Sequence, residues 1–237
     1  MERLKMFSSK LSILKRSIFQ VEIFQFLNKK DGLIAIFFIT IYLAYFYFLM
    51  NFWYSPSMKN SYFPISYPRL YAVLGITLHQ IPIVILLFII LKKSKQTLSS
   101  IGFRKKGLKS SLLIGAFLLF IYVYKYEKIN GFQLEMFYFL YYYLINIGFE
   151  EEIIFRGYLW PRLVVLLGKV WGTFLTCACF GIAHSFMPII LGDTSQGIGD
   201  WVGAGLAGHL LYAFIYTRNN NLLLPIFIHA FLDMPYK

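Results

Sequence analysis

Seven residues in the middle of the chain place three carboxylates and an arginine together in apolar surroundings. They are the run Glu150-Glu151-Glu152-Ile153-Ile154-Phe155-Arg156. Glu152 and Arg156 are four residues apart, so they share one face of a helix and can form an ion pair. Glu151 is rotated from Glu152 by about 100°, so it can face a cavity and act as a general base while its neighbour is neutralised. The alternative is a charge cluster that marks a helix end at the membrane interface.

Two further groups combine a histidine with helical spacing. Phe180 and His184 are four residues apart in one apolar segment, and His229 and Asp233 are four residues apart in another. A carboxylate one turn from an imidazole can accept a hydrogen bond from its N–H and fix its tautomer. Each pair alone could be a contact between packed helices. Ionisable groups at membrane depth are costly, however, and three such groups on three separate segments indicate one functional site.

The other histidines and the two cysteines carry less information. His79 and His209 lack a partner at helical spacing, and we expect both to be structural. Cys177 and Cys179 lie two residues apart in an apolar segment, so on a helix they face different directions. This spacing favours neither a disulfide nor a metal site.

The composition is that of a membrane protein. Hydrophobic residues make up 58% of the 237 residues, aromatic residues 20% and charged residues 14%, whereas a soluble domain carries about 25% charged residues. A net charge of +12 can indicate nucleic-acid binding, but here the basic residues lie between apolar segments and match no nucleic-acid-binding module. We therefore expect no nucleic-acid partner and an all-α, polytopic helix bundle in the lipid bilayer.

About seven (6–8) transmembrane helices are predicted, since about 20 residues cross the hydrocarbon core. The predicted spans are 33–54, 71–91, 110–126, 132–152, 171–188, 201–217 and 221–235. Residues 157–168 are too short to cross and are predicted to form an interfacial helix. Glu151 then lies near the cytoplasmic end of the fourth span and His184 nearer the outside, so they meet only if one span extends further. We expect a water-filled cavity around them, open towards the cytoplasm.

Positive charge is distributed unevenly over the connecting segments. With the N-terminus inside, eighteen Lys and Arg residues lie on the cytoplasmic side, Arg156 and Arg162 among them, and five lie outside. This bias predicts a multi-pass protein of the cell membrane with a cytoplasmic N-terminus. Residues 1–31 combine a helical apolar repeat with Lys and Arg, which predicts a basic amphipathic helix on the membrane surface or, alternatively, a plain cytosolic tail.

The three groups resemble the motifs of the CAAX protease and bacteriocin-processing family (CPBP, or Abi) of intramembrane glutamic endopeptidases. The EExxxR motif is matched by Glu151, Glu152 and Arg156, FxxxH by Phe180 and His184, and HxxxN or HxxxD by His229 and Asp233. Residues 101–104 (IGFR) and 217–225 (TRNNNLLLP) resemble two softer features of the family. The resemblance covers roughly residues 98–235. We therefore predict three parts: a basic amphipathic cytoplasmic leader (1–31), two variable N-terminal transmembrane helices (32–97) and, from the resemblance, a CPBP-like catalytic core (98–237).

The resemblance also implies the chemistry, which is peptide-bond hydrolysis by a glutamate-activated water without a cofactor or metal. By motif position, Glu151 would be the general base, assisted by His184. Glu152 and Arg156 would shape and support the site. The substrate would be a peptide or membrane protein, with roles in processing a bacteriocin-type peptide or in bacteriocin immunity.

One residue departs from the usual family pattern. His229 and Asp233 would help to stabilise the developing oxyanion, but the family position of Asp233 is usually Asn, whose amide can donate a hydrogen bond. An ionised Asp cannot donate. Asp233 is therefore expected to orient His229 or to be protonated.

Two other functions fit the same residues. One is a non-catalytic membrane regulator or immunity protein that binds a membrane partner such as a sensor kinase. The other is a zinc-dependent hydrolase in which Glu151, His184 and His229 ligate the metal, although the sequence lacks HExxH.

Overall fold

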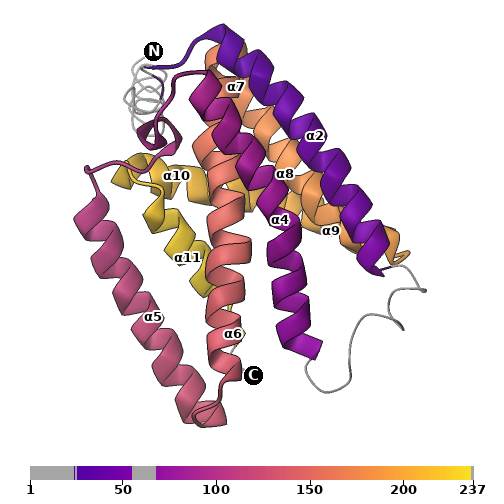
Figure 1. The fold of residues 1–237 in the computed structure, drawn as a ribbon, viewed down its shortest axis with the longest axis vertical. Coiled ribbons are helices and arrows are strands. Elements are labelled where there is room, and N and C mark those ends of the chain that lie inside the picture. The colour runs from indigo at the N-terminus through magenta and orange to yellow at the C-terminus, as the bar shows by residue number, and fades with distance from the viewer. Residues whose placement is uncertain (1–23, 25, 55–67, 236–237) are drawn as a thin grey trace, which may run out of the picture.

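The protein is a bundle of helices. The computed structural model describes residue 24 and residues 26–54 and 68–235, and this part of the chain contains helices and no strand (Figure 1). Most of the predicted leader, residues 1–31, lies outside the described residues. Five helices are long and apolar enough to cross a membrane. The prediction of an all-α, multi-pass membrane bundle is therefore confirmed.

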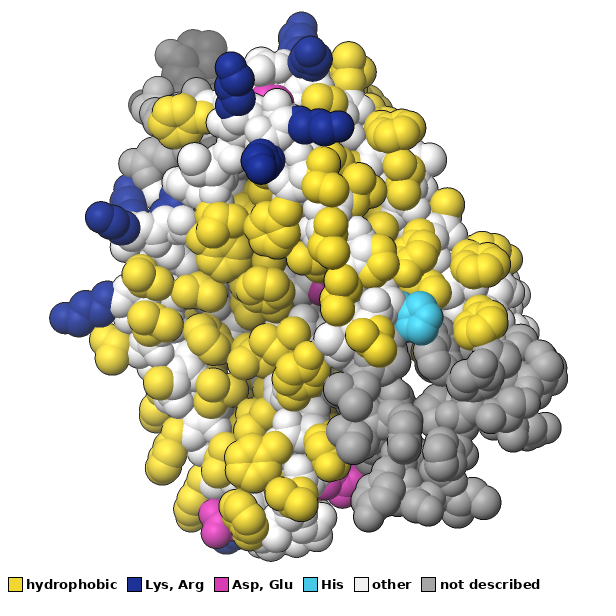
Figure 2. All heavy atoms as spheres, in the orientation of Figure 1, with side chains coloured by type: hydrophobic (Ala, Val, Ile, Leu, Met, Phe, Trp, Pro, Cys, Tyr) yellow, Lys and Arg dark blue, Asp and Glu magenta, His cyan; other side chains and the backbone are white. Residues whose placement is uncertain are grey.

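The five candidate membrane spans coincide with five of the seven predicted segments. They are α2 (Lys29–Tyr54), α4 (Pro68–Lys93), α5 (Leu108–Asn130), α8 (Lys169–Ile190), and the continuous helix formed by α9 (Thr194–Val202), η5 (Gly203–Gly208) and α10 (His209–Asn219). Apolar side chains cover the face seen in Figure 2, and Lys and Arg side chains gather at its upper end. This distribution is that of a protein whose sides face lipid.

The fourth predicted span is much longer than its predicted limits, 132–152. It comprises α6 (Glu135–Tyr141), η3 (Tyr142–Phe149), Glu150 and Glu151, η4 (Glu152–Leu159) and α7 (Trp160–Leu167), which run without a break. We call this element the central helix; it runs vertically through Figure 1 from α6 to α7. At 1.5 Å per residue it is roughly 45–50 Å long, more than the hydrocarbon core of about 30 Å.

The predicted interfacial helix over residues 157–168 is wrong. Residues 152–164 of the central helix are all buried, so this segment is surrounded by other parts of the protein. The charges of Glu152 and Arg156 do not end the helix because they neutralise each other across one turn. Arg156 was counted among the cytoplasmic loop residues, but it lies inside the bundle because it pairs with the buried Glu152.

The last predicted span, 221–235, is a short helix. α11 (Leu223–Asp233) has 11 residues, or about 16 Å, and does not reach across the hydrocarbon core alone. It packs against α5 and η3, with the ring of Phe227 filling the space left by Gly115. α11 therefore brings His229 into the bundle interior, while Asp233 at its end remains partly exposed.

Close packing fixes the hairpin between the central helix and α8. The turn is at Gly168, whose φ of 83° is in the left-handed region that favours glycine. Four residues later, a Cβ on Gly172 would lie 2.5 Å from the backbone of Leu163 and Val164. The two antiparallel helices can thus approach closely, which sets the depth of every residue along α8 relative to the central helix.

The two softer sequence features contact each other. Leu222 N–H donates to the carbonyl of Gly102 at 3.0 Å, and Arg104 Nη1 donates to Asn220 Oδ1 at 2.9 Å. The Asn221 amide donates in turn to the Arg104 carbonyl. These bonds join the loop after η2 (Leu98–Ile101) to the start of α11, and so position the helix that carries His229.

Candidate active site

The hairpin brings Glu151 and His184 to the same depth. Glu151 lies sixteen residues before Leu167, and His184 lies fifteen residues after Lys169, which places them about 24 Å and 22 Å from the turn at 1.5 Å per residue. Glu151 and His184 were expected to meet only if one span extended beyond its predicted limits. The central helix does so, since it continues to Leu167. Glu151 is consequently in the middle of a helix and not near its cytoplasmic end.

A buried ion pair forms the base of the site. Arg156 Nη1 lies 3.1 Å from Glu152 Oε1, and both side chains are fully buried. The same Oε1 atom lies 2.8 Å from Nδ1 of His229 on α11. Since a carboxylate only accepts, His229 donates through Nδ1–H, and the contact fixes α11 against the central helix.

Aromatic rings surround the arginine. The Arg156 guanidinium carbon lies 3.9 Å from the ring centroid of Phe180 and 5.1 Å from that of Tyr212. The Tyr212 ring is stacked on the imidazole of His229, with centroids 4.4 Å apart and an interplanar angle of 18°. Cation–π contacts strengthen when water is excluded, so these rings hold both the cation and the imidazole in place.

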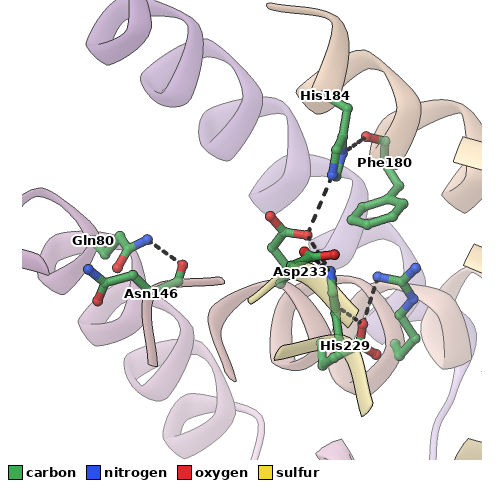
Figure 3. Close-up of polar contacts among 9 residues, drawn as sticks. Gln80, Asn146, Phe180, His184, His229 and Asp233 are labelled. Atoms are coloured by element: carbon green, nitrogen blue, oxygen red, sulfur yellow. Dashed lines mark hydrogen bonds and ion pairs between the residues drawn. The ribbon is translucent and has the colours of Figure 1, made fainter. Parts of the chain in front are cut away.

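Two imidazoles face one oxygen of Glu151. Nε2 of His184 and Nε2 of His229 each lie 3.7 Å from Glu151 Oε2. Glu151 is 17% exposed and His184 30% exposed, whereas His229 is 4% exposed. Figure 3 shows His184 in the upper part of this cluster and His229 in its lower part. Glu151 is therefore the accessible carboxylate of the pair Glu151–Glu152, as the 100° rotation between neighbours predicts.

Backbone and side-chain contacts set the orientation of both histidines. The Nδ1 atom of His184 lies 3.0 Å from the Phe180 carbonyl, which only accepts, so Nδ1 carries a proton and Nε2 faces Glu151. Asp233 Oδ2 lies 3.3 Å from Nε2 of His229 and is 41% exposed. Asp233 thus contacts the imidazole directly from one turn further along α11.

A cavity of about 210 Å³ opens beside these residues. Glu151 and His184 line one part of it, and the rest is lined by residues of α2, α4, the central helix and α8: Tyr42, Phe46, Met50, Ile76, Gln80, Tyr142, Asn146, Ile147, Glu150, Phe155, Ala183 and Met187. Met50 and Ile76 lie towards the end of α2 and the start of α4, away from the Lys and Arg side chains at the top of Figure 2. The predicted opening towards the basic end is not supported by these lining residues.

All six motif residues proposed for the site come together in this cluster, and the remaining histidines lie elsewhere. His79 lines a smaller recess beside the cavity. His209 is fully buried, with its ring 6.0 Å from that of Trp160. Cys177 and Cys179 are free and buried. In the described ranges, no group of three or more His, Cys, Asp or Glu side chains is arranged to hold a metal ion.

Sequence reasoning assigned no role to three residues beside this cluster. Tyr212 stacks on His229, and Gln80 and Glu150 line the cavity. For Tyr212 and Gln80 no sequence signal points to the site, because each lies on a helix without a recognisable motif. For Glu150, its position directly before Glu151 in the sequence was a signal that it could lie close to the site.

Comparison with known proteins agrees with the motifs. Residues 133–234 match the family model described as type II CAAX prenyl endopeptidase Rce1-like. The matched segment contains all seven motif residues, Phe180 included, together with Glu150 and Tyr212. No curated protein and no solved structure matches the chain. Residues 133–234 thus match an Rce1-like CAAX endopeptidase domain, consistent with the CPBP family, and this match supports an intramembrane endopeptidase in general.

Proposed function

We propose that the protein is an intramembrane endopeptidase that hydrolyses peptide bonds with a water activated by Glu151. The observation that carries this proposal is the position of Glu151 Oε2, 3.7 Å from Nε2 of both His184 and His229, at the wall of a cavity inside the bundle. A gap of this size between polar atoms suits a bridging water. The Glu151 carboxylate can accept a proton, and it lies beside the imidazoles of His184 and His229, which can also take part in proton transfer.

The proposed reaction begins with proton transfer from this water to Glu151. The water oxygen attacks the peptide carbonyl carbon, and the carbonyl oxygen takes the negative charge. Collapse of this intermediate breaks the C–N bond, and the proton held by Glu151 passes to the leaving amine. His184, whose Nδ1 is engaged by the Phe180 carbonyl, orients the water through Nε2.

His229 is the proposed donor to the oxyanion. Its Nδ1–H is bonded to Glu152, which leaves Nε2 directed towards Glu151 and Asp233. An N–H at this position can stabilise negative charge that develops on the carbonyl oxygen. We assign Asp233 the role of orienting His229, since a carboxylate at 3.3 Å from Nε2 accepts from it and does not donate.

The substrates that fit this site are peptides or membrane proteins that enter the bundle from the bilayer. A bacteriocin-type precursor is one such substrate, and processing or immunity would be its biological setting. We place the protein in the cell membrane with its N-terminus in the cytoplasm, on the basis of the charge bias. The catalytic core is proposed to span residues 98–237, because the loop after η2 is bonded to the start of α11.

The test uses purified protein in liposomes with a pool of randomised peptides joined to an apolar membrane anchor. Mass spectrometry identifies the products. Wild-type protein should cleave the pool, and Glu151→Gln should lower the rate about 10²–10⁴-fold, as expected for loss of a general base. Glu135→Gln, at the start of the same helix, is the matched control.

Two outcomes would contradict the proposal. Cleavage by Glu151→Gln at the wild-type rate would exclude the glutamate mechanism. Absence of cleavage by every variant, together with a cellular phenotype that survives Glu151→Gln at normal protein levels, would favour the non-catalytic regulator.

A further inference from the structure

Glu150 is a third carboxyl group at the cavity, and the proposed mechanism does not use it. Its side chain is 6% exposed, and it lines both the cavity beside Glu151 and a smaller recess of about 30 Å³ next to it. Among the described residues, no side chain forms a hydrogen bond or ion pair with its carboxyl group. An ionised carboxylate without a partner is costly to bury.

Gln80, which lines both cavities together with Glu150, is already engaged in a hydrogen bond. Gln80 Nε2 donates to the backbone carbonyl of Asn146 at 2.7 Å, and Thr77 Oγ1 donates to Asn146 Oδ1 at 3.1 Å. Figure 3 shows the bond between Gln80 and Asn146 at the side of the cluster. This carbonyl belongs to the widened segment η3, where the backbone bonds are displaced. The Gln80 amide therefore supports the cavity wall.

The walls around Glu150 suit a cation with an apolar stem. Tyr42, Tyr45 and Phe46 present aromatic rings to the recess, and Met50 and Ile76 add aliphatic surface. Within the part of the chain that the structure describes, neither cavity is lined by Lys or Arg, and the histidines that line them are His79 and His184. Aromatic faces attract cations, and the methylenes of Lys and Arg pack on apolar surface while the charged end finds a polar partner.

We propose that Glu150 and the recess beside it form a substrate subsite that receives the side chain of a lysine or arginine close to the cleaved bond. Glu150 and Glu151 are consecutive residues that line the same cavity, so the cationic residue would be within about one or two positions of that bond at 3.3–3.6 Å per residue. The ammonium or guanidinium supplies the partner that the Glu150 carboxylate lacks among the described residues. This inference rests on the proposed endopeptidase function.

The test measures selectivity in the liposome assay. Lys or Arg should be enriched at one position near the cleavage site in products of the randomised pool. For two anchored peptides that differ only by Lys or norleucine at that position, the ratio of their kcat/KM values should be about tenfold or more in wild-type protein, as expected of one charge-assisted hydrogen bond. Glu150→Gln should bring this ratio close to one, and Glu135→Gln should leave it unchanged.

Two results would overturn the inference while the endopeptidase function stands. One is cleavage of the pool without enrichment of Lys or Arg at any position. The other is a ratio that Glu150→Gln does not change. If Glu150→Gln fails to fold, Glu150→Asp should keep a preference for Lys over norleucine, and loss of that preference would count against the subsite.

A binding measurement tests the subsite independently of the proposed catalytic activity. Glu151→Gln protein in liposomes should bind the Lys peptide about tenfold more tightly than the norleucine peptide. If no variant cleaves any peptide, the proposed function fails, and equal binding of the two peptides would then exclude the subsite as well.

Discussion

Nδ1 of His229 lies 2.8 Å from Oε1 of Glu152, a contact that joins the last helix to the middle of the central helix. The same oxygen is 3.1 Å from Nη1 of Arg156. One buried carboxylate oxygen thus accepts a hydrogen bond from a histidine and forms an ion pair with a guanidinium. Glu152 therefore holds the imidazole of His229 through Nδ1, while Nε2 lies 3.7 Å from Oε2 of the neighbouring Glu151.

Removal of the buried carboxylate should destabilise the protein strongly. Glu152→Gln leaves the fully buried Arg156 without its counter-ion, which costs about 3–5 kcal/mol in comparable sites. Unfolding in detergent by denaturant measures the change. Glu127→Gln, at an exposed position of α5, should change the free energy of unfolding by less than about 0.5 kcal/mol. Equal stability of the two variants would show that the ion pair does not support the fold.

Substitutions of Asp233 can distinguish two roles, namely orientation of His229 and hydrogen-bond donation to the oxyanion. If Asp233 accepts a hydrogen bond from His229, Asp233→Asn keeps an acceptor oxygen and should reduce kcat less than tenfold. Asp233→Leu removes the acceptor and should reduce kcat by about 10²-fold, the lower end expected for a proton-transfer group. A rise in kcat on Asp233→Asn would instead indicate that this position stabilises the oxyanion by donation.

The sequence was sufficient to predict the helical membrane fold and the residues that meet at the site. Apolar segments separated by basic loops predict membrane helices directly, and the i, i+4 pairs predict which residues share a helix face. The limits of the central helix were wrong because Glu150–Glu152 and Arg156 look like a helix end when each charge is considered alone. Only the contact between Glu152 and Arg156 shows that the helix continues.

Contacts between distant segments could not be predicted. Tyr212 stacks on His229, and Gln80 bonds to the Asn146 carbonyl, yet each pair is separated by many residues and neither has a spacing rule. The depth error for Glu151 and His184 had the same origin, since depth depends on where the turn at Gly168 lies. The sequence contains the glycine but does not by itself show that the helix before it starts at Glu135.

The hairpin between α7 and α8 should tolerate no side chain at Gly172. An added Cβ would lie 2.5 Å from the backbone of Leu163 and Val164, so Gly172→Ala should lower the free energy of unfolding by about 1–3 kcal/mol, the usual cost of overpacking. Gly199 has nothing within 4 Å of the corresponding position, and Gly199→Ala should stabilise α9 by up to about 1 kcal/mol. Thermal unfolding in detergent compares the two variants, and similar melting temperatures would mean that the hairpin can relax.

The orientation of the bundle in the membrane can be tested with single cysteines. Lys93 ends α4 among basic residues, whereas Thr194 begins α9 directly after α8. The charge bias predicts that Lys93 is cytoplasmic, and α8 runs away from the basic end towards Thr194. In a background with Cys177 and Cys179 replaced by alanine, a membrane-impermeant maleimide should label Thr194→Cys in intact cells and Lys93→Cys only after permeabilisation. The reverse pattern would place the N-terminus outside. The basic end of the bundle would then also lie outside, contrary to the usual excess of Lys and Arg on the cytoplasmic side.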